Sequence, residues 1–134
     1  MKSDEIYLID THYLIWDMMA HHSFTDYVEN LLVENVGKCF YSTISYWEMA
    51  MLISKGRLEI HVSISQFFHD LEKKRNIRPL NLTPEIGDLV RQFVNEINGD
   101  PADRIIVATA LHHKAILVTA DENLKSLSFV ETIK

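Results

Sequence analysis

The chain of 134 residues lacks several features that mark other classes of protein. Its single cysteine, Cys39, excludes an internal disulfide and is consistent with a reducing cytoplasm; its apolar surroundings indicate a core position. No apolar run approaches the roughly 18 residues that a membrane span needs. Asp4 and Glu5 precede an apolar run of only four residues, so we expect no signal peptide. The sequence therefore indicates a cytoplasmic protein without a membrane segment.

Positive charge is also scarce, because 13 Lys and Arg stand against 19 Asp and Glu, for a net charge of −6. This balance argues against a protein that coats nucleic acid non-specifically. The charge is uneven, however, because residues 55–91 carry a net +2 and the remainder −8. A basic flank beside an acidic pocket is compatible with holding a phosphate backbone. A solvated helix face explains each of these cations equally well.

Three catalytic signatures are missing. The sequence has no Gly-rich phosphate loop and no Cys/His zinc spacing, and Ser42 and Ser45 lack the context of a nucleophile elbow. The histidine pairs at 21–22 and 112–113 are adjacent and so point different ways on a helix. His12, two residues after Asp10, is a weaker candidate for a substrate contact. These absences leave the carboxylates as the main candidates for catalytic chemistry.

Short apolar runs alternate with helical patterns along the chain. Strands are expected at 6–10, 39–41, 78–82, 115–119 and 129–130. Helices are expected after Thr11, at 25–36, 42–55 and 63–75, from Thr83 to near Gly99, at 100–113, and as a short turn around 124–127. This alternation predicts an α/β fold with a mostly parallel central sheet and helices on both faces, in one domain over residues 1–134.

Four acids are placed by this topology at one edge of the sheet. Parallel strands end there and the following helices start there, and ligands of such sheets bind there. Asp10 ends the first strand and Asp121 follows the last long one. Glu48 lies early in the helix after the second strand, and Asp103 lies in the first turn of the helix that opens at Asp100. The topology thus predicts a cluster of carboxylates.

Each acid also has an ordinary structural explanation. Asp10 and Asp121 are typical turn residues, Asp103 suits a helix N-terminus, and Ser45-x-x-Glu48 matches a capping box. Their joint placement favours a site over four separate coincidences. Two carboxylates about 4 Å apart repel by about 4 kcal/mol at an effective dielectric near 20. The cluster must therefore take up protons, recruit Arg104, or bind a cation.

Oxygen ligands without cysteine favour Mg²⁺ or Mn²⁺ over Zn²⁺. Mg²⁺ keeps several waters, which allows one to act as a nucleophile while the ion neutralises a phosphate. The chemistry expected of the cluster is metal-assisted phosphodiester hydrolysis. Thr11 and Thr119 are candidates for orienting a carboxylate or a water, with plain hydrogen bonding at a strand end as the equal alternative.

Four segments carry a resemblance to a known family: residues 8–12 (LIDTH), 42–48 (STISYWE), 100–110 (DPADRIIVATA) and 118–121 (VTAD). In this order they resemble the PIN-domain family and, within it, the VapC-type toxins of bacterial toxin–antitoxin pairs. The resemblance implies a PIN-like three-layer α/β/α sandwich and a Mg²⁺- or Mn²⁺-dependent ribonuclease. It also implies homodimers, and neutralisation by a small antitoxin that often blocks the acidic site.

The same resemblance assigns roles to single residues. The metal-binding acids would be Asp10, Glu48, Asp103 and, more peripherally, Asp121, whereas Asp100 resembles the acid that caps the helix. Residues 55–98 match no motif of the family, so the choice of RNA stays open. Two other hypotheses are kept: a PIN-like module that binds nucleic acid or protein without cutting, and, more weakly, a small-molecule phosphatase.

Overall fold

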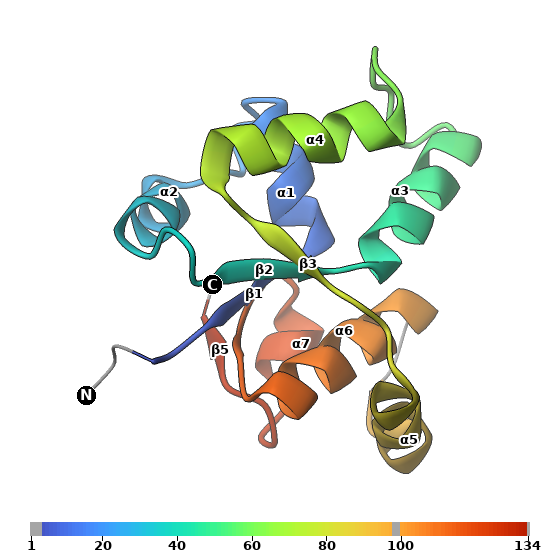
Figure 1. The fold of residues 1–134 in the computed structure, drawn as a ribbon. Helices are drawn as coiled ribbons and strands as arrows, with labels where there is room; N and C mark the ends of the chain where they lie inside the picture. Colours follow the sequence, from blue (N-terminus) through green and yellow to red (C-terminus); the bar gives the residue numbers. More distant parts are fainter. Residues whose placement is uncertain (1–3, 98–99, 134) are drawn as a thin grey trace.

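The computed structural model describes residues 4–97 and 100–133 (Figure 1). Within them the strands are β1 (Tyr7–Ile9), β2 (Cys39–Ser42), β3 (Arg78–Leu80), β4 (Ile116–Val118) and β5 (Thr132–Ile133). The helices are α1 (Thr11–Met18), α2 (Asp26–Glu34), α3 (Ile44–Ser54), α4 (Ile64–Arg75), α5 (Pro84–Phe93), α6 (Pro101–His113) and α7 (Glu122–Lys125). None of the helices in this described part has the length and apolar character needed to cross a bilayer.

The strands form one sheet in the order β3-β2-β1-β4-β5, and every pairing is parallel. β1 lies in the centre, as its uninterrupted apolar sequence predicts, with Tyr7 opposite both Cys39 and Ile116. Cys39 is buried, and burial raises the pKa of its thiol to about 11. The predicted core position of Cys39 is therefore confirmed.

Helices cover both faces of the sheet, as the alternating pattern predicts (Figure 1). Ile9 and Val118 belong to a core that they share with α1, α2, α3 and α4. Leu8 and Leu117, their neighbours along the strands, belong to a second core that they share with α6 and α7. Side chains alternate between the faces along each strand, so both faces are apolar. The three-layer α/β/α prediction is confirmed.

A buried carboxylate ties α4 to α1. The side chain of Asp17 is only 2% exposed and accepts hydrogen bonds from Arg75 Nε and Nη2, both at 2.9 Å. Lys74 Nζ adds a contact of 2.9 Å from a side chain that is 45% exposed. The basic end of α4 therefore provides the positive charge that makes burial of Asp17 tolerable.

Two predicted element boundaries in the C-terminal half of the chain are wrong, those of the last strand and of α5. The last strand is Thr132–Ile133 and does not include Phe129 or Val130. Phe129 instead stacks on Phe93, with ring centroids 4.7 Å apart, and this contact holds its segment against the end of α5. α5 ends at Phe93, earlier than predicted. Ile97 is buried although it lies beyond the end of this helix. The predicted stop at Gly99 lies outside the described residues.

Removing the carboxylate of Asp17 is expected to lower the free energy of unfolding by about 3 kcal/mol, because Arg75 would be left partly buried without a partner. Urea denaturation of Asp17→Ala beside wild type measures this loss. Lys74→Ala serves as the comparison and should cost less than about 1 kcal/mol, since Lys74 is half exposed. Equal losses in the two variants would contradict this account of the contact.

Candidate active site

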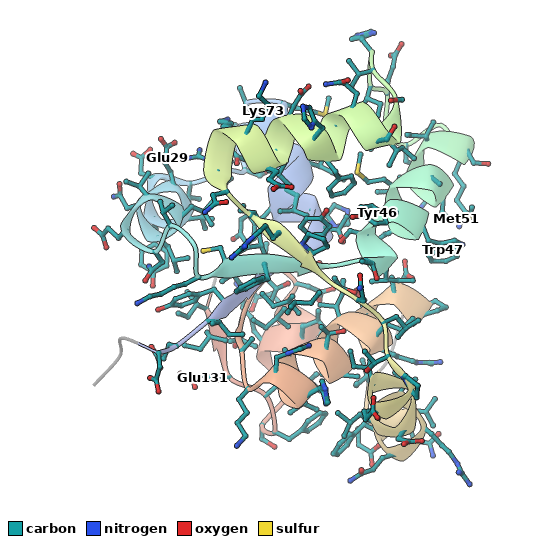
Figure 2. The ribbon with its side chains drawn as sticks, in the orientation of Figure 1. Glu29, Tyr46, Trp47, Met51, Lys73 and Glu131 are labelled. Carbon is teal, nitrogen blue, oxygen red and sulfur yellow. The ribbon has the colours of Figure 1, made fainter. Side chains whose placement is uncertain are left out.

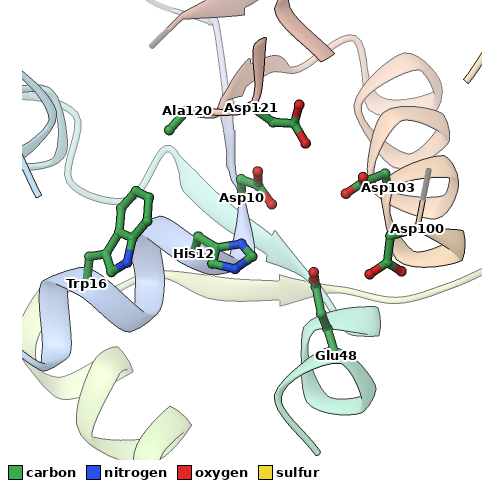
Figure 3. A pocket seen from close by; sticks show the side chains of 8 residues that line it. All are labelled: Asp10, His12, Trp16, Glu48, Asp100, Asp103, Ala120 and Asp121. Atoms are coloured by element: carbon green, nitrogen blue, oxygen red, sulfur yellow. The ribbon is translucent and has the colours of Figure 1, made fainter. Parts of the chain in front are cut away.

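A pocket of about 410 Å³ opens at the carboxyl edge of the sheet (Figure 3). Its lining residues come from the ends of β1 and β4 and from α1, α3 and α6: Asp10, His12, Trp16, Glu48, Asp100, Asp103, Ala120 and Asp121. The four acids predicted to meet are therefore brought to one pocket. Figure 3 shows their carboxylates surrounding a common space between α3, α6 and the strand ends.

Asp10 is the most tightly held of these acids. It caps α1, where its Oδ1 accepts a 2.7 Å hydrogen bond from the Thr11 amide. Its Oδ2 accepts a 2.6 Å hydrogen bond from Thr119 Oγ1. The two hydrogen bonds leave little freedom of rotation to the side chain. Burial raises the pKa of Asp10, the hydrogen bond from Thr119 works against that rise, and the charge of Asp121 adds to it.

Glu48 presents a buried oxygen without a partner. The residue is 5% exposed, and its Oε1 has no hydrogen bond within residues 4–97 and 100–133. The alternative of a capping box is not realised, because α3 begins without a side-chain cap and the Ser45 hydroxyl pairs with Thr11 Oγ1 at 2.7 Å. Burial raises the pKa of Glu48, the side chain of Thr11 works against that rise, and the charge of Asp10 adds to it. An unsatisfied buried carboxylate oxygen is costly and points to a ligand.

Asp103 lies in the first turn of α6, whose cap is provided by a different acid. Asp100 Oδ1 accepts the amide of Ala102 at 2.9 Å, so Asp100 has the geometry of the capping residue. Burial raises the pKa of Asp103 to about 7, and the charges of Asp10 and Glu48 contribute to this shift. Near neutral pH this carboxyl can therefore hold or release a proton.

Asp121 is bound more loosely to the edge of the pocket. It caps α7, with Oδ1 accepting the Asn123 amide at 2.8 Å. Its own amide donates to Thr119 Oγ1 at 3.0 Å. Thr119 therefore connects Asp10 and Asp121, which is the orienting role that the sequence suggests for it. Asp121 is half-buried, whereas Asp10 and Glu48 are buried, so its position in the pocket is more peripheral.

Other candidates have different contacts. The Thr11 hydroxyl pairs with Ser45, and its amide contacts Asp10. The Thr11 side chain also lies near Glu48 and lowers the pKa of that carboxyl. Arg104 does not line the pocket and donates from Nε to the carbonyl of Ile97 at 3.2 Å. Its supporting role stays a prediction that this geometry does not favour. Trp16 lines the pocket and was not predicted to do so; its place four residues after His12, on the same face of α1, is the signal that could have shown it.

The donors of the pocket suit a hard divalent cation, because they are carboxylate oxygens and include one buried oxygen without a partner. As placed, no three Asp, Glu, His or Cys side chains among the described residues are close enough to bind one ion together. A Mg²⁺ ion requires only one or two direct carboxylates and keeps several waters. The donors of the pocket therefore fit a hydrated divalent ion.

Topology and pocket together define an α/β protein with an acidic pocket at the carboxyl edge of a parallel sheet. Its relationship to known proteins is equally clear: the profile of the PIN domain family matches residues 7–130. The chain belongs to the PIN domain family.

The protein is similar to ribonuclease VapC22 of Mycobacterium tuberculosis, with 28% identity over 119 residues that cover 89% of each chain. It also superposes on chains of solved structures. One is DNA-bound VapBC from Salmonella typhimurium, with a TM-score of 0.71, 14% identity, and coverage of 96% of this chain and 97% of that chain. Another is VapBC-1 from nontypeable Haemophilus influenzae, with a TM-score of 0.70, 17% identity and the same coverage. These likenesses confirm the predicted PIN-like fold.

The raised pKa of Asp103 predicts how stability depends on pH in a chelating buffer. Native Asp103 keeps its proton up to about pH 7, whereas the unfolded chain releases it near 3.8. Between these values the native state binds more protons, so the free energy of unfolding falls as pH rises from about 4 to about 7. Asp103→Asn should therefore be the more stable protein at pH 8, by about 1–2 kcal/mol for this partly exposed side chain.

Urea unfolding of both proteins at pH 8 and pH 4.5 measures the effect. The two stabilities should converge at the lower pH, where the carboxyl is protonated in the native wild type. A gap that is the same at both values would show that Asp103 does not titrate as described.

Proposed function

We propose that this protein is a metal-dependent ribonuclease that hydrolyses RNA phosphodiester bonds and serves as the toxin of a toxin–antitoxin pair. The observation that carries the proposal is the buried Oε1 of Glu48, which has no partner among the described residues and belongs to a pocket shared with Asp10 and Asp103. The likeness to a protein named ribonuclease VapC22, over 89% of both chains, supports the same reaction.

Asp10, Glu48 and Asp103 would hold Mg²⁺ or Mn²⁺, with Asp121 at the periphery. Such an ion would supply an activated water for attack and positive charge for the phosphate. Thr119 and the Thr11 amide fix the carboxylate of Asp10 before substrate arrives, which reduces the reorganisation needed during reaction. Asp103, whose pKa is about 7 when no ion is bound, would give up its proton to become a ligand.

The remaining features follow the family expectation. The proposal includes one PIN domain over residues 1–134, a cytoplasmic location, a homodimer and a cognate antitoxin as partner. The solved structures with this fold include a toxin–antitoxin complex from Klebsiella pneumoniae, which supports the antitoxin. An antitoxin segment that enters the acidic pocket would neutralise its charge and block substrate.

A non-catalytic PIN-like binding module is the second candidate. It is favoured by one observation, that no three potential ligands among the described residues are close enough to bind one ion directly. Calorimetric titration separates the two functions, since the module predicts no heat of binding at millimolar Mg²⁺ or Mn²⁺. The partnerless oxygen of Glu48 argues for the enzyme.

Asp10→Asn and Asp103→Asn are each expected to lower the rate of RNA cleavage at least 100-fold while leaving the fold intact, because each removes a charge that holds the ion. Cleavage of a labelled RNA mixture in Mn²⁺ provides the measurement, and induced expression in bacteria provides the test of growth arrest. Asp88→Asn changes an exposed acid on α5, outside the pocket, and should retain wild-type activity in both assays.

Chelation gives the complementary result. Cleavage by wild type should stop in excess chelator and return when Mn²⁺ or Mg²⁺ is added back. Activity that persists in chelator, or in both pocket variants, would end the metal-dependent account.

A further inference from the structure

The acidic pocket cannot bind RNA through its own charge. Its described lining contains five carboxylates and no Lys or Arg, and the whole chain carries a net charge of −6. A bound metal ion would offset part of this charge, but only near the reacting phosphate. Most of the affinity for single-stranded nucleic acid comes from cations that follow the backbone and from aromatic rings that stack on bases. These groups must lie beside the pocket.

A second cavity of about 290 Å³ adjoins the acidic pocket at the end of α3. Glu48 and Asp100 line both cavities, so the two share a wall. The second cavity adds Trp47, Lys55 and Arg57, which are the residue types missing from the first. An RNA strand that passes over Glu48 would therefore leave the acidic pocket and meet two cations and an aromatic ring.

Trp47 has an exposed side chain that the core does not require. It is 44% exposed, and it precedes Glu48 on α3, so the two side chains leave the helix about 100° apart. Figure 2 shows Trp47 beside Met51 on the outer side of α3. An exposed indole on a helix surface at the mouth of a cavity offers a platform on which a base can stack.

Lys55 and Arg57 are available cations. Both are exposed, and neither side chain makes a hydrogen bond or ion pair with any described residue. Their place is set by the end of α3: Gly56 adopts φ +71°, its amide bonds to the Ile53 carbonyl, and the Arg57 amide bonds to the Leu52 carbonyl. This glycine-dependent turn brings Arg57 back alongside the last turn of the helix.

We propose that the cavity formed by Trp47, Lys55 and Arg57 is a subsite for single-stranded RNA adjoining the scissile phosphodiester. Trp47 stacks on a base, and Lys55 and Arg57 contact backbone phosphates. The subsite rests on the proposed ribonuclease function and extends it, because it assigns part of substrate choice to residues 47–57. Unpaired bases are required, since a base held in a duplex cannot lie flat on the indole.

The test measures binding of a fluorescent single-stranded RNA by anisotropy, with every variant built on Asp103→Asn so that the RNA stays intact. Lys55→Ala/Arg57→Ala should weaken binding at least tenfold and reduce the slope of log K against log salt by about 1.4, the loss of two phosphate contacts. Trp47→Ala should weaken binding about 5- to 160-fold, the range for one stacked base, and Trp47→Phe should recover most of the loss.

Matched controls come from the opposite side of the molecule. Lys73→Ala removes an exposed cation on α4, and Tyr27→Ala removes an aromatic side chain on α2 that is 58% exposed. Figure 2 shows Lys73 at the far end of α4 from Trp47. Both controls should bind RNA within twofold of the parent.

The outcomes separate this subsite from the function on which it rests. Cleavage of RNA by wild type, with all subsite variants binding like the controls, would overturn the subsite and leave the ribonuclease. Binding that depends on the three residues, in a protein that cuts no RNA, would support the subsite and remove the enzyme. Loss of a protein partner in the variants without loss of RNA affinity would overturn the subsite and assign the cavity to protein.

Discussion

Repulsion among carboxylates at one edge of the sheet is the constraint on which the rest of the structure depends. Asp10, Glu48 and Asp103 all have raised pKa values, chiefly because they are buried. The charge of Asp10 also raises the pKa of Glu48 and Asp103, and the charge of Asp121 raises that of Asp10 and Asp103. Such a cluster lowers stability unless protons or a cation compensate. The carboxylates lie at the carboxyl ends of the parallel strands. This edge of the sheet is also where ligands bind in such folds, so phosphodiester hydrolysis is expected there.

The surrounding structure keeps the acids in place against their repulsion. Asp10 is fixed from two strands, because Thr119 follows the strand that pairs with its own. The pair of hydroxyls on Thr11 and Ser45 ties the start of α1 to the start of α3 and so fixes the helix that carries Glu48. Two apolar cores, one on each face of the sheet, provide the rigidity that the site requires.

Sequence reasoning predicts the strands and the meeting of the acids well, because both follow from apolar periodicity and from the rule that parallel strands end together. Sequence reasoning fails where contacts between separate elements determine the position of a residue. Phe129 is of a residue type that favours strands, but its ring stacks on Phe93 outside the sheet. Arg104 is the cation nearest in sequence to the acids, yet its guanidinium bonds to a carbonyl. The choice of Ser45 as partner for the Thr11 hydroxyl depends on how α1 and α3 pack, which no local pattern contains.

Proton release on metal binding tests the central claim most directly. An ion that enters this pocket must displace the proton from Asp103, whose pKa is about 7, before that carboxylate can contribute. Calorimetric titration with Mn²⁺ in two buffers of different ionisation enthalpy counts the protons released. The account predicts release of at least about one proton at pH 6 and a smaller release at pH 8.5. Saturable binding without proton release at pH 6, or no binding at all, would contradict it.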